Sequence, residues 1–310
     1  MTTPVGKASD YKEITIISGK GGTGKTTVVA SLAVLAENKI LADNDVDAAD
    51  LHLLLAPVTV EGVDFYGGSK AVIHTDQCIA CGKCAAACHF DSIREDGPQN
   101  NRGATTFRVD PLACEACGLC ALVCPVNAIE SIPTVVGRCY VSQTDRGPMA
   151  HAKLGIAEDN SGRLVTQVRN RAAELAREFG QELILGDGPP GTGCPVIASV
   201  SGADLILVVT EPTVSGVHDM DRVLQLTAHF GIQARVIINK ADLNLEQAAR
   251  IEKIAGDAGM PVIARIPFDS NVHDALMAGR TVVEYGKGPA AEAMHNVWRI
   301  LKQELQEMNS

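Results

Sequence analysis

The fold is decided by the stretch Ile14-Thr15-Ile16-Ile17-Ser18-Gly19-Lys20-Gly21-Gly22-Thr23-Gly24-Lys25-Thr26-Thr27. Glycines without a Cβ let backbone N–H groups turn toward a polyphosphate, the Lys25 ammonium can reach the outer phosphate oxygens, and the Thr26 hydroxyl can hold Mg²⁺. An apolar strand, this loop and a following helix therefore predict a phosphate-binding loop. The expected nucleotide-binding residues of the loop are Gly21, Gly22, Thr23, Gly24, Lys25, Thr26 and Thr27.

Short apolar runs without polar alternation recur along the rest of the chain. They lie at residues 14–17, 183–185, 205–209 and 236–238. Such runs are typical of strands that are buried on both faces, and helical stretches separate them here. The alternation predicts an α/β fold, a P-loop NTPase whose mostly parallel sheet carries helices on both faces.

Composition limits the class of protein. The 310 residues are 46% hydrophobic and 21% charged, which suffices for one large core and a smaller domain. The formal net charge of −10 argues against a nucleic-acid partner, because phosphates favour clustered Lys and Arg. A polar start and the lack of an apolar run of roughly 20 residues argue against a signal peptide and a membrane helix. We therefore expect a cytoplasmic protein with no stable membrane insertion.

Eight of the ten cysteines form two runs with the spacing C-x2-C-x2-C-x3-C. The first run is Cys78, Cys81, Cys84 and Cys88, and the second is Cys114, Cys117, Cys120 and Cys124. Zinc sites rarely repeat such a run, and disulfide scaffolds belong to small secreted chains. The spacing resembles that of bacterial two-cluster ferredoxins. It predicts a ferredoxin-like α+β domain at residues 60–136, inserted into an ATPase domain at 1–59 and 137–310.

The ferredoxin resemblance also implies which cysteines bind each [4Fe–4S] cluster. Three close cysteines of a run hold one cluster, and the fourth reaches the other. The first cluster would take Cys78, Cys81, Cys84 and Cys124, and the second would take Cys88, Cys114, Cys117 and Cys120. The sequence departs from the family at His89, which stands where the first run would usually have proline.

Lys20 defines the kind of phosphate loop. A lysine at this early position resembles the deviant Walker A motif of the MinD, ParA and nitrogenase iron protein group. In that group the lysine crosses a dimer interface to the γ-phosphate of the partner. The resemblance implies an ATPase that closes on ATP, either as a homodimer or as a heterodimer with a paralogous ATPase.

Two acidic motifs extend the resemblance. In this group the second aspartate of a pair such as Asp45-Val46-Asp47 orients the attacking water near Mg²⁺, which implies that role for Asp47. The segment 183–191 resembles a Walker B strand, with Asp187 holding the water shell of the metal. The resemblance thus implies Lys20, Lys25, Asp47 and Asp187 as catalytic residues, with Thr26, Asp47 and Asp187 around Mg²⁺.

The expected base-binding residues follow two later strands. In the MinD group an asparagine such as Asn239 bonds the adenine edge, and a loop that resembles 266–269, with Pro267 and Asp269, covers the base. GTPases also use the pattern N-K-x-D found at 239–242, so this motif alone leaves the base open. The prediction of ATP rests on Lys20.

Three functions from different classes are compatible with these motifs. Our main expectation is an ATPase, using ATP or ADP, Mg²⁺ and two [4Fe–4S] clusters, that couples dimerisation to electron transfer toward a redox or iron–sulfur partner. The alternatives are an iron–sulfur assembly factor resembling Mrp proteins and a positioning ATPase like MinD with a ferredoxin sensor. Cys194 follows Asp187 by the offset of a cluster-binding cysteine in the nitrogenase iron protein, and is a candidate ligand of an additional cluster.

Overall fold

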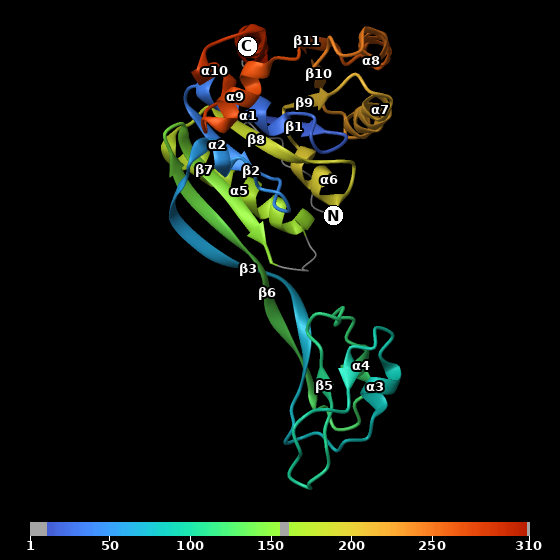
Figure 1. The fold of residues 1–310 in the computed structure, drawn as a ribbon. Helices are drawn as coiled ribbons and strands as arrows, with labels where there is room; N and C mark the ends of the chain where they lie inside the picture. The colour runs from blue at the N-terminus through green and yellow to red at the C-terminus, as the bar shows by residue number, and fades with distance from the viewer. Residues whose placement is uncertain (1–10, 156–160, 309–310) are drawn as a thin grey trace. The chain divides into compact units, whose positions relative to one another are not determined.

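The computed structural model describes residues 11–155 and 161–308, and within them the chain divides into two compact units. The first unit contains residues 11–63, 139–153 and 161–308, and the second contains 64–138 with 154 and 155. Two 16-residue strands, β3 (Val58–Ile73) and β6 (Ile129–Thr144), carry the chain out of the first unit and back into it (Figure 1). Each unit is described separately below.

The first unit is built on a mostly parallel sheet, as the apolar runs predict. All pairings of β1 with β8 and β9, of β2 with β7 and β8, and of β10 with β9 and β11 are parallel. The strand order is β11 (Val262–Ile266), β10 (Ala234–Asn239), β9 (Leu205–Thr210), β1 (Lys12–Ser18), β8 (Leu183–Pro190), β2 (Lys39–Asp43), β7 (Gly147–Leu154), β6 and β3.

Helices cover both faces of this sheet (Figure 1). Successive strand residues point to opposite sides, so each strand contributes side chains to both faces. On β9, Leu205 and Leu207 belong to one core cluster, whereas Ile206 and Val208 belong to another. The first core is closed by α1 (Lys25–Leu35), α2 (His52–Leu55), α9 (Ser270–Met277), α10 (Val282–Tyr285) and α11 (Pro289–Met308). The second is closed by α6 (Cys194–Val200), α7 (Val214–His229) and α8 (Leu245–Asp257), and α5 (Ser161–Phe179) packs against α6 and β2.

The second unit is small, and cysteines form part of its core. It contains α3 (Lys83–Ala87), β4 (Ile93–Arg94), β5 (Arg108–Val109) and α4 (Leu119–Leu122) between the distal ends of β3 and β6. β4 and β5 pair in antiparallel fashion. Its buried cluster consists of Cys84, Ile93, Phe107, Cys120 and Ile129. Sulfur atoms therefore occupy positions that apolar side chains would otherwise fill in so small a core.

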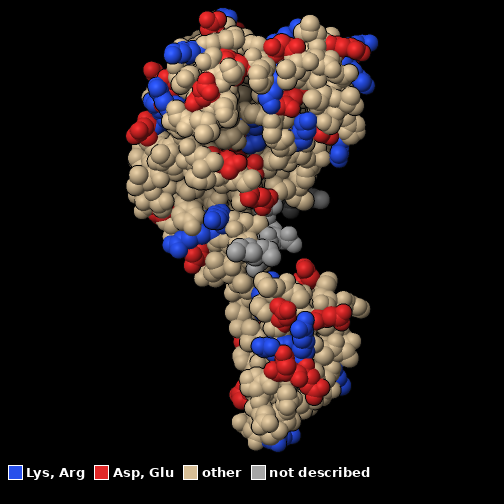
Figure 2. Space-filling model, in the orientation of Figure 1, with Lys and Arg blue, Asp and Glu red and all other residues tan. Residues whose placement is uncertain are grey.

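On the face shown in Figure 2, Lys and Arg side chains are interspersed with Asp and Glu on each unit. Of the helices in the described part of the chain, none is both long and apolar enough to cross a membrane.

Candidate nucleotide site and cysteine-lined cavities

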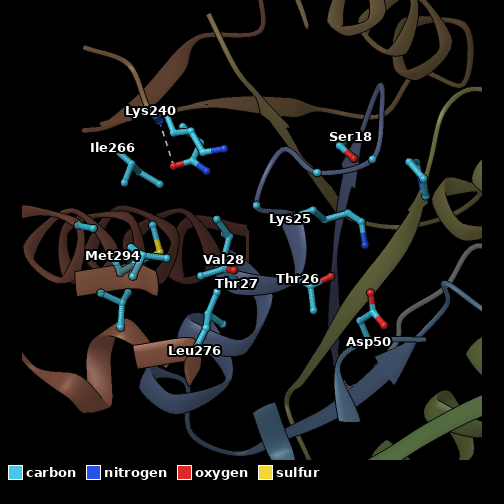
Figure 3. A pocket seen from close by; sticks show the side chains of 18 of the residues that line it. Ser18, Lys25, Thr26, Thr27, Val28, Asp50, Lys240, Ile266, Leu276 and Met294 are labelled. Carbon is cyan, nitrogen blue, oxygen red and sulfur yellow. Dashed lines mark hydrogen bonds between the residues drawn. The ribbon is translucent and has the colours of Figure 1, made fainter. Parts of the chain in front are cut away.

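A cavity of about 440 Å³ lies beside the glycine-rich loop in the first unit. Loop residues line it together with Asp45, Asp50, Pro190 and Asn239. Figure 3 shows Lys25, Thr26 and Asp50 at one end of the cavity and Ile266, Leu276 and Met294 at the other. One end thus suits phosphates and a cation, and the other suits a flat apolar base.

The glycines of the loop are required by its conformation. Gly22 and Gly24 have φ values of 78° and 87°, which L side chains rarely adopt. A Cβ on Gly24 would also lie 2.4 Å from Nδ2 of Asn239, and one on Gly19 would lie 2.5 Å from Cβ of Asp219. The loop can therefore approach its neighbours this closely only with glycine at these positions.

Lys25 and Asp187 form a buried ion pair behind the loop. The Lys25 ammonium also lies 3.5 Å from Oδ2 of Asp45, and Oγ1 of Thr26 donates a hydrogen bond of 2.9 Å to Oδ2 of Asp187. Burial alone would lower the pKa of Lys25, but the carboxylates of Asp187 and Asp45 outweigh it and raise that pKa. Lys25 is therefore a charged lysine whose partner in the structure is Asp187.

Carboxylates outnumber cations at the strand ends beside the loop. Asp43, Asp45 and Asp187 all act on the single ammonium of Lys25. Asp43 is buried, and its Oδ2 has no hydrogen-bond partner among the described residues. Burial, reinforced by the neighbouring Asp187, raises the pKa of Asp43 well above its usual range. A hard divalent cation would offset this excess of negative charge, so the residues fit Mg²⁺.

Asp47, the predicted water-orienting residue, is exposed and is not among the residues that line the cavity. Asp45 and Asp50 line it instead, and Asp45 is the one close to Lys25. The position of Asp45 relative to the end of a strand could have indicated it from the sequence. Asp43 is the last residue of β2, and Asp45 follows it by two positions, with its backbone N–H donating to Oδ1 of Asp43 at 3.2 Å.

Lys20 lies away from the cavity that its own loop forms. Its Nζ donates hydrogen bonds to Oγ1 of Thr213 at 3.2 Å and Oγ of Ser215 at 3.0 Å, and lies 3.9 Å from Oε2 of Glu211. It is not among the lining residues of the cavity. Since Thr213 is the N-cap of α7, Lys20 is held at the start of that helix.

The base-binding residues are partly where the motifs place them. Asn239 lines the cavity, and its Nδ2 donates to the backbone oxygen of Thr23 at 2.8 Å. Pro267 and Asp269 are not lining residues, whereas Ile266 is. Asp269 instead caps α9, accepting the backbone N–H of Asn271 at 3.0 Å.

The acidic residue of the N-K-x-D pattern is engaged with the chain itself. Oδ1 of Asp242 accepts a 2.6 Å hydrogen bond from the backbone N–H of Phe268. This bond holds the carboxylate against the loop that follows β11. Asp242 is not among the residues that line the cavity.

The two cysteine runs are brought together in the second unit. One cavity is lined by Cys78, Cys81, Cys84 and Cys124, and another by Cys88, Cys114, Cys117 and Cys120. Ile129 lines both, so the two cavities adjoin. Each set combines three cysteines of one run with the fourth of the other, the same grouping that the ferredoxin resemblance implies. All eight are free thiols.

The donor set of these cavities suits a polynuclear iron–sulfur group. Within the described residues, no three His, Cys, Asp or Glu side chains are grouped closely enough to hold a single metal ion. A [4Fe–4S] cluster is larger than one ion and takes four thiolates. Four sulfur donors around each cavity fit such a cluster. Cys194 is exposed at the first residue of α6, outside both cavities.

A parallel sheet whose first strand leads into a glycine-rich loop, with a lysine–aspartate pair behind that loop, defines a P-loop nucleotide-binding protein. The sequence matches the CobQ/CobB/MinD/ParA nucleotide binding domain over residues 14–282. The chain belongs to this family. The prediction of a MinD/ParA-type P-loop ATPase is thereby confirmed.

The individual proteins that the chain is similar to include MinD proteins. It is 31% identical over 296 residues to the uncharacterized protein MJ0578 of Methanocaldococcus jannaschii, covering 94% of this chain and 96% of that protein. It is 24% identical over 295 residues to the septum site-determining protein MinD of Bacillus subtilis, covering 92% and 87%. The fold is similar to that of MinD from Pyrococcus horikoshii complexed with Mg-ADP, with a TM-score of 0.58 and 19% identity over 94% and 96% of the two chains. These similarities favour the MinD-like alternative over the electron carrier.

Proposed function

We propose that this chain is a MinD-type ATPase switch that carries an iron–sulfur module. In this proposal two subunits close on Mg-ATP, hydrolysis to ADP and phosphate reopens them, and the cysteine-rich segment 60–136 senses redox state. The observation that carries the proposal is the position of Lys20, which is held by Thr213 and Ser215 outside its own nucleotide cavity.

Lys20 is suited to act on a partner subunit. Its partners in the monomer are two hydroxyls and a carboxylate 3.9 Å away, contacts that a bound triphosphate can replace. An ammonium supplied in trans would neutralise charge on the transferred phosphoryl group, as an arginine finger does. The partner is a second copy of this chain or a paralogous ATPase.

Within one subunit, nucleotide binding would exchange the partners of Lys25 and Thr26. Both side chains now contact Asp187, and both are needed by the incoming phosphates and the cation. Mg²⁺ when bound supplies charge neutralisation between the phosphate oxygens. Asp187 would help to hold the metal through its water shell, and Asp45, rather than Asp47, would orient the attacking water. Asn239 and the apolar end of the cavity receive adenine.

The sensor role of the cysteine-rich segment rests on the two cavities with four thiols each. A [4Fe–4S] cluster supplies one-electron oxidation and reduction. Electron transfer is the second candidate function, and the adjoining cavities favour it, because neighbouring clusters exchange electrons readily. In the electron-transfer candidate the nucleotide changes the reduction potentials of the clusters. In the sensor candidate it leaves them unchanged.

The proposal is tested by ATP-dependent self-association of the anaerobically purified chain, measured by sedimentation velocity. We expect dimers with ATP and monomers with ADP. Lys20→Ala should abolish the ATP-dependent dimer while leaving most of the nucleotide affinity of the monomer. Lys302→Ala, at an exposed position on α11, is the control and should dimerise normally. A chain that stays monomeric with ATP, or a Lys20→Ala variant that dimerises like the control, contradicts the proposal.

A further inference from the structure

The two cysteine runs are structural copies of each other. Residues 78–84 read C-I-A-C-G-K-C and residues 114–120 read C-E-A-C-G-L-C. The φ values of the alanines are 56° and 52°, those of the glycines are 72° and 76°, and a short helix follows each glycine. A residue in one run therefore has the same place relative to its cavity as its counterpart in the other.

The copies differ at two positions, and both differences change charge. Ile79 and Lys83 line the cavity of Cys78, Cys81, Cys84 and Cys124, which we call the lysine cavity. The matching residues Glu115 and Leu119 line the cavity of Cys88, Cys114, Cys117 and Cys120, which we call the glutamate cavity. The lysine cavity thus has an added positive charge from Lys83, and the glutamate cavity has an added negative charge from Glu115.

Other charges near the cavities do not reverse this difference. Glu130 also lines the glutamate cavity, and His74 Nε2 lies 3.0 Å from its carboxylate. Lys70 donates to the backbone oxygen of Cys114 at 3.3 Å and offsets one carboxylate there. Among the described residues, Lys83 and Glu115 have no ion-pair partner. The glutamate cavity therefore remains the more negative of the two.

Hydrogen bonds reach the cysteine sulfurs in both cavities. In the lysine cavity, Cys78 Sγ accepts from the Ala80 N–H at 3.4 Å and Cys124 Sγ accepts from the Ala128 N–H at 3.2 Å. In the glutamate cavity, Cys88 Sγ lies 3.2 Å from the Ser92 hydroxyl, and the backbone N–H groups of Ser92 and Phe90 also donate to it. Donors to cluster sulfurs stabilise the added electron. Both cavities supply such donors, so the difference between the two cavities is one of charge.

We propose that the two clusters are unequal and that the cluster in the lysine cavity accepts the first electron. This inference rests on the proposed function, which places a [4Fe–4S] cluster in each cavity. A low-potential one-electron donor is oxidised by one electron, and that cluster is reduced by one electron, with no covalent bond formed or broken. The reduced cluster is more negative by one charge, so Lys83 stabilises it. Glu115 opposes reduction of the other cluster, the one in the glutamate cavity.

The test is a potentiometric titration of the anaerobic full chain with dithionite, followed by electron paramagnetic resonance. Lys83→Leu and Glu115→Ile each install the residue of the matching position. Lys83→Leu should lower the first midpoint potential, Glu115→Ile should raise the second, and the double variant should bring the two together. A tenfold change in electron distribution corresponds to about 59 mV. Since both side chains are exposed, the shifts should shrink at high ionic strength.

Arg102→Leu removes an exposed charge of the same unit that lines neither cavity, and is the control that should leave both potentials unchanged. If two couples are present and neither matched substitution moves its predicted couple, the inequality is wrong while the clusters stand. If Lys83→Leu moves the second couple instead, the assignment is reversed and the inference fails. Protein that holds no iron under anaerobic preparation contradicts the proposed function itself.

Discussion

Two lysines of the phosphate loop, five residues apart, have different surroundings. Lys25 is buried against Asp187, whereas Lys20 is half-exposed beside two hydroxyls at the start of α7. The sequence predicts a role at a nucleotide site for both lysines, because their spacing within a glycine-rich loop is distinctive. For the water-orienting acid the resemblance implies Asp47, whereas Asp45 and Asp50 are the aspartates of this segment that line the cavity. Choosing among them requires knowing where β2 ends and which side chains then turn toward the loop.

His151 provides a test of burial at the residue scale. It lies on β7, stacks on Tyr140 with ring centroids 5.2 Å apart, and contacts Oγ of Ser142 at 2.8 Å. Burial, with a smaller effect from the charge of His52, lowers the pKa of His151 from 6.5 to about 4. The unfolded chain therefore binds a proton on this imidazole at a higher pH than the folded chain does.

Stability should fall as the pH drops from about 6.5 to about 4, because acid favours the state that binds more protons. His151→Gln should lose part of this decrease. The measurement is the thermal midpoint at several pH values, followed by fluorescence of the single tryptophan, Trp298. His229→Gln, at an exposed position on α7, should keep the wild-type pH dependence. An unchanged pH dependence in His151→Gln contradicts the assigned burial effect.

At the scale of elements, strands buried on both faces were the easiest to predict. β9 and the apolar part of β8 coincide with apolar runs because every side chain there is buried. The 16-residue strands β3 and β6 were not predicted. Much of β3 is exposed, with polar and glycine residues mixed among its valines, so neither an apolar run nor a clean alternation marks it. Its length follows from pairing with a distant segment, which local sequence does not encode.

The sharing of cysteines between runs gives a prediction for these elements. Anaerobically prepared protein should hold about eight iron and eight sulfide per chain. Cys88→Ser should damage the cluster whose other ligands belong to the second run, because Cys88 lines the glutamate cavity. Iron and sulfide analysis, with paramagnetic resonance of the surviving cluster, measures the effect.

Cys194→Ser is the matched control for Cys88→Ser, because Cys194 is exposed outside both cavities. It should keep the full iron content. Loss of iron in this control would support an additional cluster at Cys194. If Cys88→Ser instead removed the cluster bound by the rest of its own run, the shared arrangement would be wrong.

At the scale of the whole molecule, two compact units are joined through β3 and β6. The family of the first unit could be predicted from one loop, since the deviant lysine belongs to one group of ATPases. The grouping of cysteines around two cavities could be predicted from the resemblance of the two runs to bacterial two-cluster ferredoxins. The charge difference between those cavities became apparent only when the two runs were seen to have the same backbone.

In the proposed function, Lys20 acts across a dimer interface on the site of its partner. The most direct test mixes two variants, Lys20→Ala and Asp45→Ala, each expected to be inactive alone. In a mixed dimer, the site of the Lys20→Ala subunit keeps its own Asp45 and receives Lys20 from its partner. ATP hydrolysis should therefore return on mixing, and each mixed dimer should reach up to about half the activity of a wild-type dimer. If Lys20 acts within its own subunit, every site in the mixture lacks one residue. Hydrolysis that stays absent in verified mixed dimers would contradict the account.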